Sequence, residues 1–112
     1  MEKIEKYRQI VQDILLEHAS YKSINEDVEP QIAFDTQRNH YQLIHVGWSN
    51  NDKRVYGCVV HIDIKDGKIW IQHDGTEGGV ADELLEQGVP KQDIVLGFHS
   101  AFKGQFTEFA VG

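Results

Sequence analysis

The chain is poor in cysteine, proline and basic residues, and it has no long hydrophobic run. Its 112 residues include one cysteine and two prolines. A single cysteine excludes an internal disulfide and favours a cytoplasmic location. Apolar runs such as residues 14–16 and 94–96 are far shorter than the roughly 20 residues of a membrane helix. Residues 1–10 are charged and show no secretory signal, so we expect a cytoplasmic protein with no membrane partner.

Basic residues are also outnumbered by acidic ones. Eleven Lys and Arg residues stand against 18 Asp and Glu residues, which gives a net charge of −7. Affinity for nucleic acid depends on clustered Lys and Arg that neutralise phosphates, and no basic run here exceeds two residues. We therefore expect no direct nucleic-acid binding by the isolated chain, and a protein partner instead.

The N-terminal half predicts one helix followed by strands. Apolar residues at helical spacing predict a helix over about residues 2–19. Residues 21–29 carry turn formers and acids and predict a loop, and Pro30 is expected to open a strand rather than sit in its centre. Alternating patterns then predict strands over 31–36, 40–48, 54–65 and 68–74.

The C-terminal part predicts a second helix and a short strand. An apolar stripe that begins at Val80 and ends before Gly88 and Pro90 predicts a helix near residues 78–87. Residues 93–98 predict a short buried strand, whereas the tail over 100–112 fits a helix and a strand equally well. The fold class is α+β, a single domain over 1–112 with the N-terminal helix packed on a mainly antiparallel sheet.

Asp66-Gly67 predicts a two-residue hairpin turn between the strands over 54–65 and 68–74, because a type I′ turn needs two residues with positive φ. Such a turn fixes the register. It pairs Lys65 with Lys68, Ile64 with Ile69, Asp63 with Trp70, Ile62 with Ile71, His61 with Gln72 and Val60 with His73. Alternation then divides the side chains between two faces. One face carries Tyr56, Cys58, Val60, Ile62, Ile64, Ile69, Ile71 and His73, and the other carries Val55, Val59, His61, Asp63, Lys65, Trp70 and Gln72.

This register argues against a metal centre. His61 and His73 point to opposite faces, so they cannot share an ion, and the chain has no local spacing typical of a zinc site. The remaining histidines (His18, His40, His45 and His99) have no local reason to converge. We therefore expect neither a metal nor a cofactor, although a metal or small-molecule sensor built from scattered histidines is one alternative.

The face that carries His61, Asp63, Trp70 and Gln72 is the candidate partner-binding surface. Asp63-x-Lys65 resembles half of a metal-dependent nuclease site, and alternation places His61 beside it. Such a site also needs an earlier acid and a surface that holds DNA. A nuclease or hydrolase that uses Asp63, Lys65 and His61 is therefore the alternative, and a solvated strand edge is the simpler interpretation.

Four segments resemble the XisI family, the fdxN element excision controlling factors of cyanobacteria. They are FDTQRNHYQLIHVGW, RVYGCVVHIDIKDGKIWIQHDGTE, ELLEQGVPKQDIVLGFHS and QFTEFAVG, and the similarity runs nearly from end to end. The resemblance implies a role in DNA rearrangement during heterocyst development, beside a site-specific recombinase and a nuclease-like companion, XisH. It supplies no catalytic residues. We expect a non-enzymatic regulatory protein that binds such a partner and forms a homo-oligomer through exposed apolar surface.

Overall fold

A computed structural model describes residues 2–21 and 27–111 of the chain. The elements in chain order are α1 (Glu2–Ala19), β1 (Asp27–Asp35), β2 (His40–Trp48), β3 (Arg54–Lys65), β4 (Lys68–Asp74), α2 (Val80–Glu86), a 3-10 turn (Lys91–Asp93), β5 (Ile94–Leu96) and α3 (Ala101–Gly104). Both predicted helices and all the predicted strands are present. Within the described residues, no helix has the length and apolar character needed to cross a membrane.

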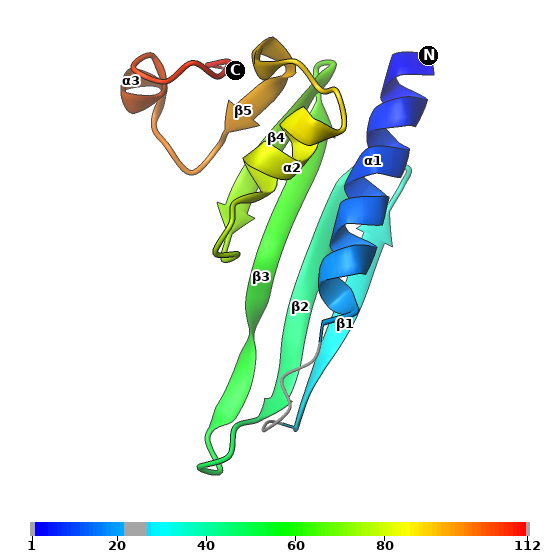
Figure 1. Cartoon of the computed structure of the whole chain (residues 1–112), viewed down its shortest axis with the longest axis vertical. Coiled ribbons are helices and arrows are strands. Elements are labelled where there is room, and N and C mark those ends of the chain that lie inside the picture. The colour runs from blue at the N-terminus through cyan, green and yellow to red at the C-terminus, as the bar shows by residue number, and fades with distance from the viewer. Residues whose placement is uncertain (1, 22–26, 112) are drawn as a thin grey trace.

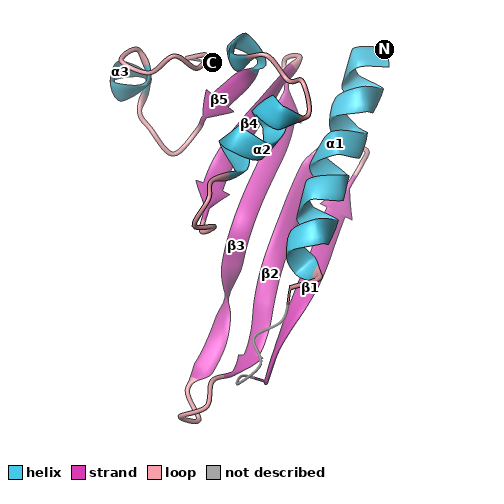
Figure 2. Cartoon of the chain, in the orientation of Figure 1, coloured by secondary structure: helices cyan, strands magenta, loops and turns pink. Residues whose placement is uncertain are grey.

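The five strands form one sheet in chain order, from β1 at one edge to β5 at the other. All neighbours are antiparallel except β4 and β5, which run parallel. Helices α1 and α2 lie side by side over the same face of this sheet (Figures 1 and 2). The α+β class and the helix packed on a mainly antiparallel sheet are therefore confirmed.

The core lies between the sheet and these two helices. Its strand residues occupy alternate positions, as expected where one face of a sheet is buried. Buried members include Val11 and Leu15 of α1, Tyr41 and Leu43 of β2, Val60 and Ile62 of β3, Ile69 and Ile71 of β4, and Val80 and Leu84 of α2. We call this side of the sheet the covered face and the opposite side the open face.

Strand β1 begins at Asp27, earlier than predicted, and residues 22–26 of the expected loop lie outside the described residues. Pro30 pairs with His45 inside this strand rather than at its start. The strand tolerates proline because it is an edge strand, where one side of the backbone has no neighbour. Gly47 lets β1 approach β2 closely, since a Cβ there would lie 2.1 Å from the Asp27 carbonyl oxygen.

The tail contains both a short helix and a bridge to the sheet. After β5, the chain forms α3 and then returns so that Ala110 bridges to Val95. The phenylalanines at 98, 102 and 106 remain exposed along this path. Neither alternative for this tail therefore describes the whole segment: the helix is limited to α3, the strand character to the single bridge at Ala110, and turns and bends lie between them.

Candidate functional site

The hairpin of β3 and β4 follows the predicted register near its turn. Asp66 and Gly67 have φ values of 54° and 76°, as a type I′ turn requires. The pairs from Lys65–Lys68 through Ile62–Ile71 are those expected from the sequence. Counting from a two-residue turn was therefore correct for four pairs along each strand.

Beyond Ile71, an irregularity in β4 changes the register. His61 pairs with His73 instead of Gln72, and Val60 pairs with Asp74 instead of His73. One extra residue on one strand shifts the alternation of everything that follows it. The prediction that His61 and His73 point to opposite faces is therefore wrong, because their pairing places both on the open face.

A second irregularity lies in β3 at Val59, between the Leu43–Val60 and Ile44–Cys58 pairs. It places Cys58 opposite Ile44 on the open face, and Tyr56 follows on the same side. Val59 instead packs against the core. The expected placement of Tyr56, Cys58 and Val59 is therefore wrong, since the sequence was read with unbroken alternation.

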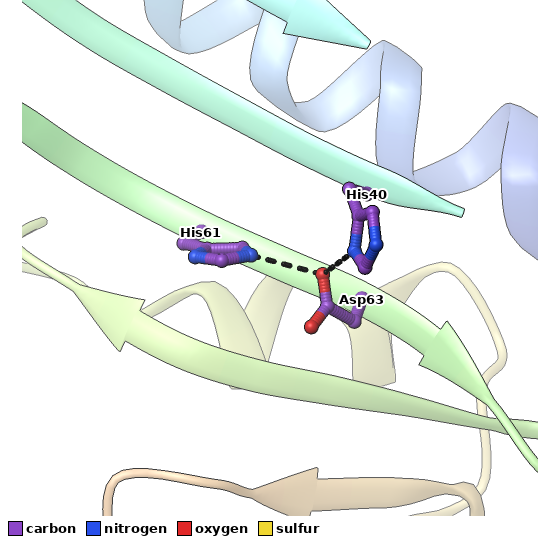
Figure 3. A group of neighbouring side chains, drawn as sticks. All are labelled: His40, His61 and Asp63. Carbon is purple, nitrogen blue, oxygen red and sulfur yellow. Dashed lines mark hydrogen bonds and ion pairs between the residues drawn. The ribbon is translucent and has the colours of Figure 1, made fainter. Parts of the chain in front are cut away.

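Three potential ligand side chains meet on the open face. His40 stands at the start of β2 directly across from Asp63 of β3, and His61 lies two residues before Asp63 on the same strand. Nδ1 of His40 is 2.8 Å and Nε2 of His61 is 2.9 Å from Oδ1 of Asp63. Figure 3 shows both rings directed at this one oxygen, with α1 behind the strands.

The carboxylate at the centre of this group is the most protected member. Side-chain exposure is 16% for Asp63, 31% for His61 and 54% for His40. Partial burial by itself would raise the pKa of Asp63, but hydrogen bonds from the two histidines and from Gln72 outweigh it and hold that pKa below its usual range. The carboxylate is therefore a stable anion facing two imidazoles.

The four residues of the predicted binding surface do lie together on the open face. Gln72 Nε2 donates to Oδ2 of Asp63 at 3.2 Å, and Trp70 pairs with Asp63 across the strands. Lys65 places its ammonium 4.9 Å from the centre of the Trp70 ring, which is a cation–π contact. Among the described residues, the Trp70 indole nitrogen is buried without a hydrogen-bond partner.

The open face becomes apolar toward the other end of β2 and β3. Trp48 and Tyr56 are exposed there, at 49% and 73%, and the Arg54 guanidinium stacks over the Trp48 ring. Cys58 lies between this end and the polar group, and burial raises the pKa of its thiol. It therefore behaves as a small hydrophobe rather than as a nucleophile.

Comparison with known proteins decides the family. A family model described as XisI protein matches residues 1–111. The chain belongs to the XisI family. It is 46% identical to a XisI-like protein from Anabaena variabilis, whose crystal structure gives a TM-score of 0.89 with 97% of this chain and 99% of that chain covered.

A second XisI structure carries a functional description. It is the fdxN element excision controlling factor XisI from Anabaena variabilis, 36% identical, with a TM-score of 0.82 and coverage of 98% of this chain and 99% of the other. No curated protein matches the chain. The family expected from the sequence is therefore confirmed, and its sheet with helices on one face is the XisI fold.

His40 is the site residue that the sequence reasoning missed. Counting back from the Trp48–Arg54 pair without interruption would place His40 opposite Ile62, whereas the bulge at Val59 places it opposite Asp63. The available signal was the run Cys58-Val59-Val60, where strict alternation of apolar and polar residues fails. Such a run in a strand is typical of a bulge.

Proposed function

We propose that this XisI-family chain is a non-enzymatic regulatory protein of DNA-element excision that acts by binding a protein partner through the open face of its sheet. The XisI structure described as an excision controlling factor supports the role in excision control. The composition of the open face supports binding through this surface. It presents two exposed aromatic rings, Trp48 and Tyr56, and a hydrogen-bonded polar group around Asp63.

The composition of this face suits protein recognition. Aromatic residues are enriched in the cores of interfaces, and here Trp48 and Tyr56 stand exposed on one sheet surface. His61, Asp63 and Gln72 supply directional polar groups farther along the same face, toward the other end of the strands. A surface with aromatic anchors and fixed hydrogen-bonding groups can combine affinity with specificity.

Charge favours a basic partner. The chain carries a net charge of −7, and complementary charge speeds association between proteins. A nuclease-like XisH companion or a site-specific recombinase must itself contact DNA, so each offers basic surface. We therefore place this chain against such a protein rather than against nucleic acid directly.

The test is capture of an XisH-like companion by the untagged full chain at micromolar concentrations. The wild type is expected to co-elute with the companion in gel filtration. The double variant Trp48→Ala, Tyr56→Ala removes the aromatic anchors and is expected to weaken binding at least about 30-fold, since each truncated hot spot costs roughly 1–2 kcal/mol.

The tail provides a matched control. Phe102 and Phe106 are exposed aromatic residues that contact each other at α3, which lies beyond the β5 edge of the sheet in Figure 1. The double variant Phe102→Ala, Phe106→Ala is expected to bind as the wild type does. A wild-type chain that does not bind the XisH-like companion, or equal losses of binding in the two double variants, would contradict the proposal. The homo-oligomer stays a prediction, and both surfaces are candidates for it.

A further inference from the structure

We propose that His40, His61 and Asp63 form a binding site for a divalent transition-metal ion of the Zn²⁺ class. This proposal does not rest on the regulatory function above, because it follows from the side chains alone. The three ligand atoms, one from each residue, all lie within 4.8 Å of one another. They come from two adjacent strands whose pairing holds their backbones in place.

The strand backbone holds the three ligand side chains on one side of the sheet. His61 and Asp63 are two residues apart on one strand, so alternation directs both to the same side of the sheet. His40 reaches the pair from the neighbouring strand, directly opposite Asp63. Each ligand thus stands on a strand rather than on a loop, and sites built on strands hold their geometry better.

The donor spacing is close to that of an occupied site. With metal–ligand bonds of about 2.0–2.2 Å, adjacent donors in a tetrahedral zinc site lie roughly 3.3–3.5 Å apart. The two nitrogens here are 2.8 and 2.9 Å from Oδ1 of Asp63. All three donor atoms already lie within 4.8 Å of one another, and both rings are partly exposed and outside the core, so rotation of the two side chains can bring the donors to the spacing of an occupied site.

The ligand chemistry suits a transition ion rather than Mg²⁺ or Ca²⁺. Imidazole nitrogens favour zinc and its neighbours in the first transition row, whereas magnesium and calcium prefer oxygen ligands. Gln72 donates to Oδ2 of Asp63, which leaves Oδ1 directed at the histidines. Outer partners of this kind orient a ligating carboxylate and tune its affinity for metal.

Three protein ligands leave at least one coordination position open. His40 is more than half exposed and the group lies on the outer surface of the sheet. The open position therefore faces outward, where water or a side chain of a docked protein can fill it. Structural zinc sites are usually closed by four protein ligands, so this site differs from a purely structural one.

The test is isothermal titration of tag-free full-length chain with Zn²⁺ in a non-chelating buffer, paired with the visible spectrum of the Co²⁺-loaded protein. We expect one ion per chain and the intense absorption of four-coordinate Co²⁺. His40→Ala and His61→Ala are each expected to weaken Zn²⁺ binding by at least about 100-fold, and Gln72→Ala by about 10-fold, because loss of an outer partner alone typically weakens binding 10- to 100-fold.

His99→Ala is the matched control, because His99 is an exposed histidine outside the group. It is expected to bind Zn²⁺ as the wild type does. Circular dichroism checks that each variant is folded, and the exposed position of His40 makes His40→Ala the variant least expected to disturb the fold. Absence of Zn²⁺ binding by the wild type, or unchanged binding in His40→Ala and His61→Ala, would overturn the site.

Discussion

The two faces of the sheet use the same strands for different purposes. On the covered face, Tyr41 and Ile62 are completely buried beneath the helices. One residue away along the same strands, His40 and Asp63 meet at the open face. Because successive side chains of a strand point to opposite faces, a substitution can change the side chains of one face and leave those of the other unchanged. Stability and recognition can therefore be tested separately within single strands.

The largest effect is expected on the covered face. Ile62→Ala removes a fully buried side chain from the centre of β3 and leaves a cavity beneath the helices. We expect the free energy of unfolding to fall by about 3 kcal/mol, within the range found for such truncations. Urea denaturation followed by circular dichroism measures this loss.

Tyr56→Ala is the control on the open face of the same strand, where the side chain is largely exposed. Its free energy of unfolding is expected to stay within about 0.5 kcal/mol of the wild-type value. If both variants lose similar stability, the open face is part of the folding core and the division between the faces fails.

An intermediate effect is expected where Asp74 joins the sheet to α2. Gly79 has no side chain with which to cap that helix, and Asp74 takes over by accepting from the Val80 N–H at 2.7 Å and from the Thr76 hydroxyl at 2.6 Å. Asp74→Ala is expected to lower the free energy of unfolding by about 1–2 kcal/mol. Urea denaturation measures this loss, and Glu86→Ala, at an exposed position in the same helix, is the control. If both variants lose the same free energy of unfolding, Asp74 does not act as the cap of α2.

The smallest expected effect is on how the free energy of unfolding depends on pH in the acidic range. The pKa of Asp74 is held low because hydrogen bonds from Thr76 and Val80 outweigh burial, and the pKa of Asp63 is low for the corresponding reason on the open face. A carboxylate with a lowered pKa in the folded state adds stability above its unfolded pKa of about 3.9. That stability is lost as the pH falls through the lower, folded value.

The unfolding free energy should therefore drop below about pH 4, and the drop should be shallower in both Asp63→Asn and Asp74→Asn. Glu86→Gln, at an exposed position, is expected to keep the wild-type slope. Denaturation series between about pH 6 and pH 3 measure these slopes. A wild-type slope in Asp63→Asn would show that protonation of Asp63 does not contribute to the loss of stability in acid.

Local rules predicted most of the fold. The amphipathic pattern gave α1, and Asp66-Gly67 gave the turn and the first pairs of the β3–β4 hairpin. These features depend on residues close in sequence, where periodicity and turn chemistry are reliable guides. The class and the helix-covered sheet followed directly from them.

The candidate site of His40, His61 and Asp63 was not predicted because it depends on a bulge in β3, and a second irregularity in β4 made the predicted position of His73 wrong. The bulge at Val59 shifts β3 by one residue against β2 and so brings His40 to Asp63. The irregularity beyond Ile71 moves His73 to the face of His61. A bulge reflects the twist and packing of a whole sheet, which the residues of one strand do not specify alone.

The two edges of the sheet limit how copies of the protein can associate. Pro30 lies within the β1 edge and contributes no N–H, so an added strand would lack a donor there. At the opposite edge, β5 has only three residues and the returning tail bridges to it through Ala110. A proline within one edge strand and a short, partly covered strand at the other edge both protect against strand addition and fibre growth.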